Sequence, residues 1–423
     1  MKRIATSWRR ALTFGVVGAG LLTATAAAAA TVTVWCWDPN FNGATMQEAA
    51  TRYAASHPDF KINVVDFAKA DLEQKLQAQL ASGTTEGLPD IVLIEDYGAQ
   101  KYLQSFPGAF EPLNSAVDYS KFAPYKAQLA TLNGKTYSLP FDSGVTGLFY
   151  RTDYLAQAGY KEADLQDINW DQLIEIGKAV EAKTGHKLLS LDINDAGPIR
   201  IMLQSAGSWY FTADGKANIA DNPVFKAALG DFAKVLKSGI YRPASGWTDY
   251  TGGFTTGQAA GAITGVWMTG TIKPNADQSG KWGVAPIPKL QVEGATHASN
   301  LGGSSWYVLA AAPDKAEAID FLASIWGKDV DFYQKILVNQ GAFGTLLAAR
   351  DGPAFQASDA YFSGQPVWQN FTTWLAKIPS VNYGIFTNEA DTAVAAQLPG
   401  LKDGGDLDAA IKAIDAQVKQ QIQ

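Results

Sequence analysis

Asn133-Gly-Lys-Thr-Tyr-Ser-Leu-Pro-Phe-Asp-Ser-Gly-Val-Thr-Gly-Leu-Phe-Tyr-Arg151 contains two short β-rich runs that meet through Pro and Gly, and the architecture depends on how these runs are connected. In the first run, apolar residues occupy alternate positions from 137 to 141, which is typical of a half-buried strand. Pro140 lacks the N–H that a sheet ladder needs, so this strand is predicted at an edge or at a crossing. Asp142-Ser-Gly144 then precedes the second run. The pattern fits a hairpin within one sheet or a crossing between two lobes, and by themselves these residues favour the hairpin.

The first 30 residues have the composition of a secretory signal peptide. Lys2, Arg3, Arg9 and Arg10 form a basic start, an apolar run follows, and Ala28-Ala-Ala30 fits a cleavage site. Export to a periplasm is predicted, by the general route rather than the twin-arginine route. Without this segment the chain has 30 basic and 41 acidic residues, a net charge of −11. That charge argues against nucleic acid and anionic membranes as partners.

Composition also limits how the mature chain is held together. About 390 residues with 47% hydrophobic content predict two domains. Cys36 is the single cysteine, so an intrachain disulfide is excluded and stability must come from burial. We interpret this thiol as a small buried hydrophobe. Trp is abundant, and although most of these rings are expected in the core, a flat indole also stacks on the apolar face of a sugar.

Strands and helices alternate through the first hundred residues. Strands are predicted at Thr31–Trp37, Lys61–Phe67 and Asp90–Glu95, with amphipathic helices between them. This order predicts parallel strands with right-handed crossovers, and in such sheets ligands bind beyond the carboxyl ends of the strands. Those ends carry Trp37-Asp38-Pro39-Asn40 and Glu95-Asp96-Tyr97. Each alone is more often a turn or a helix cap, but two at equivalent strand ends indicate a site.

A second pattern of strands and helices begins near residue 154. One strand is predicted to end at Trp267, where a short helix follows from Met268, and another spans Leu301–Leu309. Helices are predicted at Trp170–Val180, Pro198–Ser205, Pro223–Ser238, Lys315–Trp326, Asp329–Val338, Pro366–Leu375 and Asp406–Ile422. With a second lobe after it, the 133–151 stretch is better interpreted as a crossing between lobes than as a hairpin.

The order of these landmarks resembles the family 1 extracellular solute-binding proteins, the carbohydrate receptors of ABC importers that include the maltose-binding type. No single one of the matching segments is specific for the family, but their number and their order over nearly the whole mature chain are specific. The matching segments are Thr33–Trp37, Gly87–Val92, Asn133–Pro140, Gly147–Arg151, Asp153–Gly159, Trp170–Leu173, Phe254–Ala260, Ile263–Trp267 and Lys315–Leu322. Arg151 departs from the pattern, because the family commonly has Asn there.

The resemblance implies an α/β, two-lobed periplasmic-binding-protein (Venus flytrap) fold, in which each lobe is a mainly parallel sheet flanked by helices and the hinge has three segments. It places the N-terminal lobe at 31–142 plus 300–350, and the C-terminal lobe at 143–299 plus 351–423. The first crossing is expected at Phe141–Val145 and the second near Ser299–Ser304. The implied partners are a neutral mono- or oligosaccharide and the permease subunits of an ABC transporter in the inner membrane. A monomer without a cofactor or a metal is expected.

The resemblance also places a set of residues around the cleft between the lobes. A neutral sugar needs carboxylates and amides for its hydroxyls and aromatic planes for its C–H faces. Asp142, Trp267 and Trp37 lead this set, in which Lys and Arg are scarce, as expected for a neutral ligand. The predicted ligand-binding residues are Trp37, Asp38, Asn40, Glu95, Asp96, Asp142, Ser143, Trp209, Trp247, Trp267, Met268, Gly302, Gly303, Ser304 and Tyr383.

A secreted glycoside hydrolase is the alternative. Glu95, Asp96 and Asp142 could serve as acid and nucleophile, since such enzymes need two carboxylates about 5–10 Å apart. The chain has no Gly-x-Ser-x-Gly, no His-Glu-x-x-His and no Cys nucleophile with a matching His, and its three histidines lack metal-ligand spacing. Capture rather than catalysis is therefore predicted. The segment Trp37 to Asn42 is similar to that of arabinose or arabino-oligosaccharide receptors, while lactose and other galactosides stay open.

Overall fold

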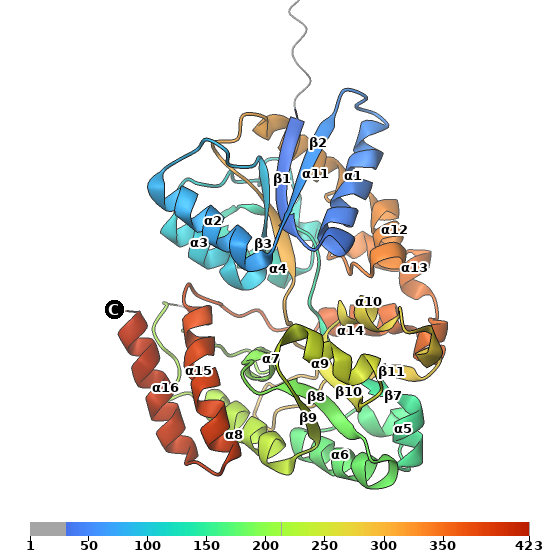
Figure 1. Ribbon diagram of the computed structural model, residues 1–423. Helices are drawn as coiled ribbons and strands as arrows, with labels where there is room; N and C mark the ends of the chain where they lie inside the picture. The colour runs from blue at the N-terminus through green and yellow to red at the C-terminus, as the bar shows by residue number, and fades with distance from the viewer. Residues whose placement is uncertain (1–30, 213, 423) are drawn as a thin grey trace, which may run out of the picture.

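The computed structural model describes residues 31–212 and 214–422, which form two lobes, each built around a five-stranded sheet (Figure 1). The predicted signal peptide lies outside the described residues. The first sheet has the order β2-β1-β3-β12-β6 and the second has the order β11-β7-β10-β8-β9. The strands of the first sheet are β1 (Thr31–Trp37), β2 (Lys61–Phe67), β3 (Ile91–Glu95), β6 (Ser138–Pro140) and β12 (Ser304–Val308). Those of the second are β7 (Thr146–Arg151), β8 (Lys187–Asp192), β9 (Tyr241–Ala244), β10 (Ala259–Gly265) and β11 (Trp282–Ala285).

Helices flank both sheets, and the predicted ones are confirmed with ends that differ by a few residues. Several helices were not predicted, and α15 is one of them, because it contains Pro399 and its many alanines give it no clear apolar stripe. The helices are α1 (Ala44–Ala54), α2 (Lys69–Ser82), α3 (Ala99–Ser105), α4 (Pro124–Leu129), α5 (Thr152–Gln157), α6 (Trp170–Thr184), α7 (Gly197–Ser205), α8 (Pro223–Ser238), α9 (Gly246–Thr255), α10 (Met268–Ile272), α11 (Lys315–Ile325), α12 (Val330–Gln340), α13 (Pro353–Gln356), α14 (Val367–Leu375), α15 (Thr387–Lys402) and α16 (Leu407–Gln421).

The first sheet is covered on both faces because β1 presents apolar side chains to both. Val34 and Cys36 are buried in the core cluster that also contains Met46 of α1, so the interpretation of Cys36 as a buried hydrophobe is confirmed. Trp35 points the other way and belongs to a second cluster with Leu72 of α2. The alternation of β1 therefore fixes which helices cover each face.

Each sheet contains as many antiparallel as parallel strand pairs, so the sheets are mixed rather than mainly parallel as expected. β1 pairs parallel with β2 and β3, whereas β12 pairs antiparallel with β3 and β6. In the second sheet, β7 is antiparallel to both β10 and β11. β12 and β7 run in the opposite direction because each enters its lobe from the other lobe, at the end of the sheet that faces the cleft.

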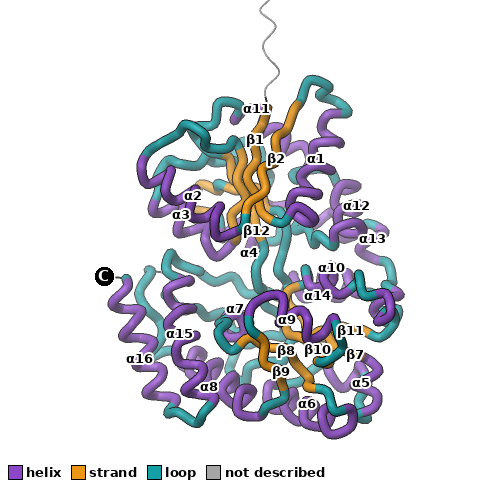
Figure 2. The backbone as a smooth tube through the Cα atoms, in the orientation of Figure 1, coloured by secondary structure: helices purple, strands orange, loops and turns teal. Residues whose placement is uncertain are grey.

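The 133–151 stretch crosses between the lobes, as inferred from its context. Asn133 and Gly134 both have positive φ and form the tight turn between β4 (Thr131–Leu132) and β5 (Lys135–Thr136). β6, which ends at Pro140, is an edge strand of the first sheet, and the next strand along the chain lies in the second sheet. Figure 2 shows the loops that join the two sheets at the centre of the molecule.

The crossing segments lie against each other in the middle of the molecule. The chain returns to the first lobe between β11 and β12, and it leaves that lobe again before α14, which packs on β7. A Cβ at Gly144, on the first crossing, would lie 1.9 Å from the carbonyl oxygen of Leu301, on the second. Only glycine permits this approach.

None of the helices in the described ranges combines the length and apolarity that a membrane span requires.

Candidate functional site

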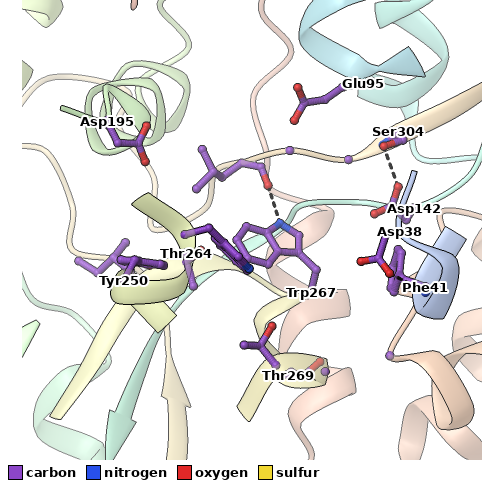
Figure 3. A pocket seen from close by; sticks show the side chains of 18 of the residues that line it. Asp38, Phe41, Glu95, Asp142, Asp195, Tyr250, Thr264, Trp267, Thr269 and Ser304 are labelled. Atoms are coloured by element: carbon purple, nitrogen blue, oxygen red, sulfur yellow. Dashed lines mark hydrogen bonds between the residues drawn. The ribbon is translucent and has the colours of Figure 1, made fainter. Parts of the chain in front are cut away.

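A cleft of about 880 Å³ lies between the lobes, where β1 and β3 end. The loops after these strands line it from the first lobe, and the loops after β8 and β10 line it from the second (Figure 3). Most of the predicted residues line this cleft. They are Trp37, Asp38, Asn40, Glu95, Asp142, Trp247, Trp267, Gly302, Gly303 and Ser304.

Asp38 turns the chain at the end of β1. Its φ is 59°, in the left-handed region that Asp tolerates better than most residues, and its Oδ1 accepts the N–H groups of Asn40 (3.1 Å) and Phe41 (3.0 Å). These bonds cap the helical turn Pro39–Gly43. The side chain is still exposed, so a carboxylate is presented to the cleft from a fixed backbone.

Glu95 occupies the equivalent place at the end of β3, and Lys69 holds it there. The Lys69 ammonium forms an ion pair with Glu95, and it also lies 5.9 Å from the centre of the Trp37 ring. Lys69 is itself at the start of α2, which connects β2 to β3. One cation therefore lies between the side chains at both strand ends of the first lobe.

Aromatic rings form the wall of the second lobe. Trp267 follows β10, and its Nε1 donates to the carbonyl oxygen of Leu301 at 2.9 Å, which fixes the plane of the ring. The ring centres of Trp267 and Trp247 are 5.5 Å apart, and those of Trp247 and Tyr250 are 5.9 Å apart. Trp247 is 55% exposed, which leaves a large apolar surface open to the cleft. Such a surface is suited to stacking on a flat C–H face.

The second crossing passes along the cleft with two glycines. Gly302 and Gly303 have φ values of 80° and 88°, which only glycine adopts without strain. A Cβ at 302 would lie 3.3 Å from Nε1 of Trp267, and one at 303 would lie 2.8 Å from Oδ2 of Asp96. Glycine is therefore needed here for conformation and for space.

Asp142 is the buried carboxylate of the cleft. Its Oδ1 accepts the N–H of Ser304 at 2.7 Å, a bond that joins the first crossing to the second. The residue is 5% exposed, and this burial raises the pKa of Asp142 to about 7. Asp142 lies beside the cleft as predicted, but one of its oxygens is committed to the backbone of the hinge.

Three of the predicted residues lie beneath the cleft instead of lining it, which corrects their assignment as ligand contacts. Both oxygens of Asp96 accept from Nζ of Lys126, at 2.6 and 2.8 Å, and burial raises the pKa of Asp96 to about 6. The hydroxyl of Ser143 is 2.6 Å from that of Tyr125. Met268 is completely buried at the start of α10. These side chains support the hinge and the walls of the cleft.

Trp209 and Tyr383 are also placed behind the cleft, and their assignment is corrected in the same way. With Tyr97 of the first lobe they form a buried aromatic cluster, in which Tyr383 lies 4.6 Å from each of the other two rings. The indole of Trp209 donates to Thr387 at 3.0 Å, and the Tyr383 hydroxyl donates to Gln204 at 2.9 Å. The cluster packs the lobes against each other.

Several cleft residues of the second lobe were missed from the sequence. Asp195 precedes α7 and accepts the N–H of Gly197 at 2.8 Å, and Figure 3 shows its carboxylate on the opposite side of the cleft from Glu95. Tyr250 and Thr264 line the same wall. The signal for Asp195 was available, because it lies in the loop after β8 as Asp38 lies in the loop after β1.

Arg200 was missed as well, and with Lys273 it is a cation that lines the cleft from the second lobe. Its guanidinium lies 4.4 Å from the centre of the Tyr97 ring and 3.5 Å from the carboxylate of Asp391. The cation–π contact and the ion pair thus compensate much of the charge of the Arg200 guanidinium. Lys273 is paired with Asp359 at 2.8 Å. Among the other groups of the cleft, carboxylates from both lobes and exposed rings can bind a neutral polyhydroxyl compound. Within residues 31–212 and 214–422, no group of three or more His, Cys, Asp or Glu could hold a metal ion.

Comparisons with known proteins agree with this geometry. Residues 48–362 match the family of bacterial extracellular solute-binding proteins. A lactose-binding protein of Rhizobium radiobacter is 59% identical over 415 residues, which cover 98% of each chain. An arabinooligosaccharide-binding protein of Bacillus subtilis (strain 168) is 27% identical over 301 residues, 68% of each chain. The crystal structure of an extracellular solute-binding protein of family 1 has a TM-score of 0.78 at 21% identity, and covers 93% of this chain and 100% of its own.

Proposed function

The chain belongs to the bacterial extracellular solute-binding proteins, and we propose that it captures lactose or a related neutral galactoside in its interlobe cleft and delivers it to an ABC import permease. The observation that carries this proposal is the similarity, over almost the full length, to a lactose-binding protein. The cleft supports it, because exposed carboxylates and aromatic rings line it from both lobes. Arabino-oligosaccharides are the second candidate, favoured by a more distant relative.

The two lobes supply complementary contacts for such a ligand. Asp38 and Glu95 of the first lobe and Asp195 of the second can accept hydrogen bonds from sugar hydroxyls, while Trp247 and Trp267 offer planes for the C–H faces. A ligand that touches both lobes favours the arrangement in which they are closed around it. A micromolar dissociation constant, about −8 kcal/mol, suffices for a receptor that must also release its cargo.

The setting of this activity is part of the proposal. The segment 1–30 would direct export, the mature protein would act as a monomer in the periplasm, and the closed form would dock on the permease. The lobe limits predicted above, 31–142 plus 300–350 and 143–299 plus 351–423, are consistent with the strand composition of the two sheets. Capture requires no cofactor.

A thermal-shift and calorimetry panel tests the ligand. Lactose, galactobiose, arabinobiose and maltose are compared with a galacturonic acid disaccharide as the charged control. A ligand at 100 times its dissociation constant stabilises the folded state by about 2.7 kcal/mol, so lactose should raise the melting temperature clearly. A shift with arabinobiose alone would replace galactosides by arabino-oligosaccharides. No shift with any neutral sugar would refute the proposal.

Catalysis is not favoured by the same geometry. Glu95 is held by an ion pair with Lys69, and one oxygen of Asp142 is held by the Ser304 backbone, so both carboxylates already make contacts within the protein. The protein should therefore return lactose unchanged after prolonged incubation. Release of galactose and glucose at a catalytic rate would overturn the receptor assignment.

A further inference from the structure

We propose that Thr269 strengthens ligand capture without touching the ligand, by donating a hydrogen bond to the side-chain oxygen Oε1 of Gln340 across the seam between the lobes. The inference rests on the proposed function, because the bond contributes when the lobes close on a sugar. Thr269 belongs to α10 in the second lobe, and Gln340 is the last residue of α12 in the first. Thr269 is therefore a positioning residue.

The backbones of the two lobes nearly touch at this seam. A Cβ at Gly341, where φ is +69°, would lie 3.3 Å from Oγ1 of Thr269. A Cβ at Gly270 would lie 3.5 Å from the carbonyl oxygen of Gln340. Figure 1 shows α10 on the side of its lobe that faces α12. All four residues line the cleft, so the seam is one of its edges.

Both groups that would form the bond lack a partner within the described residues. Thr269 is completely buried, and its Oγ1 has no hydrogen bond, nor has Oε1 of Gln340. Helical threonines elsewhere, such as Thr255 and Thr372, donate to the carbonyl four residues earlier. For Thr269 that position is Gly265 in β10, outside the helix, which leaves the hydroxyl without this local acceptor.

The Thr269 hydroxyl and Oε1 of Gln340 lie on opposite sides of the boundary between the lobes and can become partners of each other. Leaving buried polar groups unbonded is costly, and a small displacement of α10 against the end of α12 would pair them. A bond formed only in the ligand-bound arrangement adds its free energy to that of ligand binding. One ordinary neutral hydrogen bond corresponds to about fivefold in affinity.

The test compares lactose binding by calorimetry for the wild type and three variants. Thr269→Val keeps the shape and removes the hydroxyl, and should weaken lactose binding by about fivefold. Thr269→Ser restores the hydroxyl and should recover most of the affinity. Thr345→Val is the matched control. The Thr345 hydroxyl is equally buried and has no partner in the described part of the chain, but it lies outside the cleft lining, so this variant should bind lactose as the wild type does. Melting temperatures without sugar identify any variant that is merely misfolded.

A double-mutant cycle with Gln340→Met identifies the acceptor. If the bond exists, Thr269→Val should cost little further affinity in the Gln340→Met background, whereas additive losses would overturn the proposed pair. Unchanged lactose affinity in Thr269→Val would also overturn it, while leaving the receptor function intact. Failure of the wild type to bind any neutral sugar would instead refute the proposed function.

Discussion

Replacing Asp142 by Asn should make the stability of this protein less dependent on pH between about 4 and 7. The side chain is almost fully buried, and burial raises the pKa of Asp142 from 3.8 to about 7. The folded state therefore holds the proton more tightly than the unfolded state. The stabilisation from protonation is fully present below pH 4 and is lost as the pH rises to about 7.

The size of the effect follows from the shift. Each pKa unit corresponds to about 1.4 kcal/mol, so a shift of about three units corresponds to roughly 4 kcal/mol as an upper value. Asn has nearly the same shape, and its side-chain oxygen can still accept the N–H of Ser304. Asp142→Asn should thus match the wild type near pH 4 and exceed its stability at pH 8.

Urea unfolding at a series of pH values from 4 to 8 measures the difference directly, because the free energy of unfolding is extrapolated at each pH. Asp118→Asn serves as the control, since Asp118 is an exposed acid whose pKa is lowered by its bonds to Ser120. It should not gain stability at high pH. An Asp142→Asn variant that is less stable than the wild type at pH 8 would contradict this prediction, because the bond of the carboxylate to Ser304 would then outweigh the cost of burying the charge.

Three further substitutions separate ligand contacts from hinge contacts. Asp142→Ala should lower lactose affinity at least ~10-fold in calorimetry, because it removes the carboxylate beside the cleft and its bond to Ser304. An unchanged affinity would remove Asp142 from the site. Trp247→Ala should weaken lactose binding by about tenfold with little change in melting temperature, because the ring is mostly exposed; equal affinity would show that it does not stack on sugar. Gly144→Ala should lower the urea midpoint strongly, since its Cβ would meet the Leu301 carbonyl at 1.9 Å, and a wild-type midpoint would contradict the packing of the crossings.

The fold could be predicted largely because its signals are local. The alternation of β1, the glycine turn before β5 and the proline at the end of β6 are each visible in a few adjacent residues of the sequence. No local sequence signal gives the direction of β12 and β7, because this direction depends on the lobe from which the chain arrives. A pattern of strands and helices therefore predicted two lobes but not the mixed sheets.

The candidate site was predicted only in part for a related reason. Glu95 and Asp96 are neighbours with the same chemistry, yet one faces the cleft and the other is buried against Lys126. The sequence around Asp96 does not indicate that Lys126 is its partner, because Lys126 lies thirty positions further along the chain. Likewise Trp209 and Trp267 are equally plausible stacking rings until Thr387 is found bonded to the first.

Trp267, a proposed ligand contact, is connected to the hinge by two hydrogen bonds. Trp267 donates to Leu301 on the second crossing, and Ser304 on the same crossing donates to Asp142 on the first. A sugar that presses on the Trp267 ring therefore acts on both crossings, so substitutions at Asp142 should change affinity and hinge stability together. Trp247 contacts Trp267 but, among the residues that the structure describes, has no such bond to the crossings, so its removal should change affinity alone.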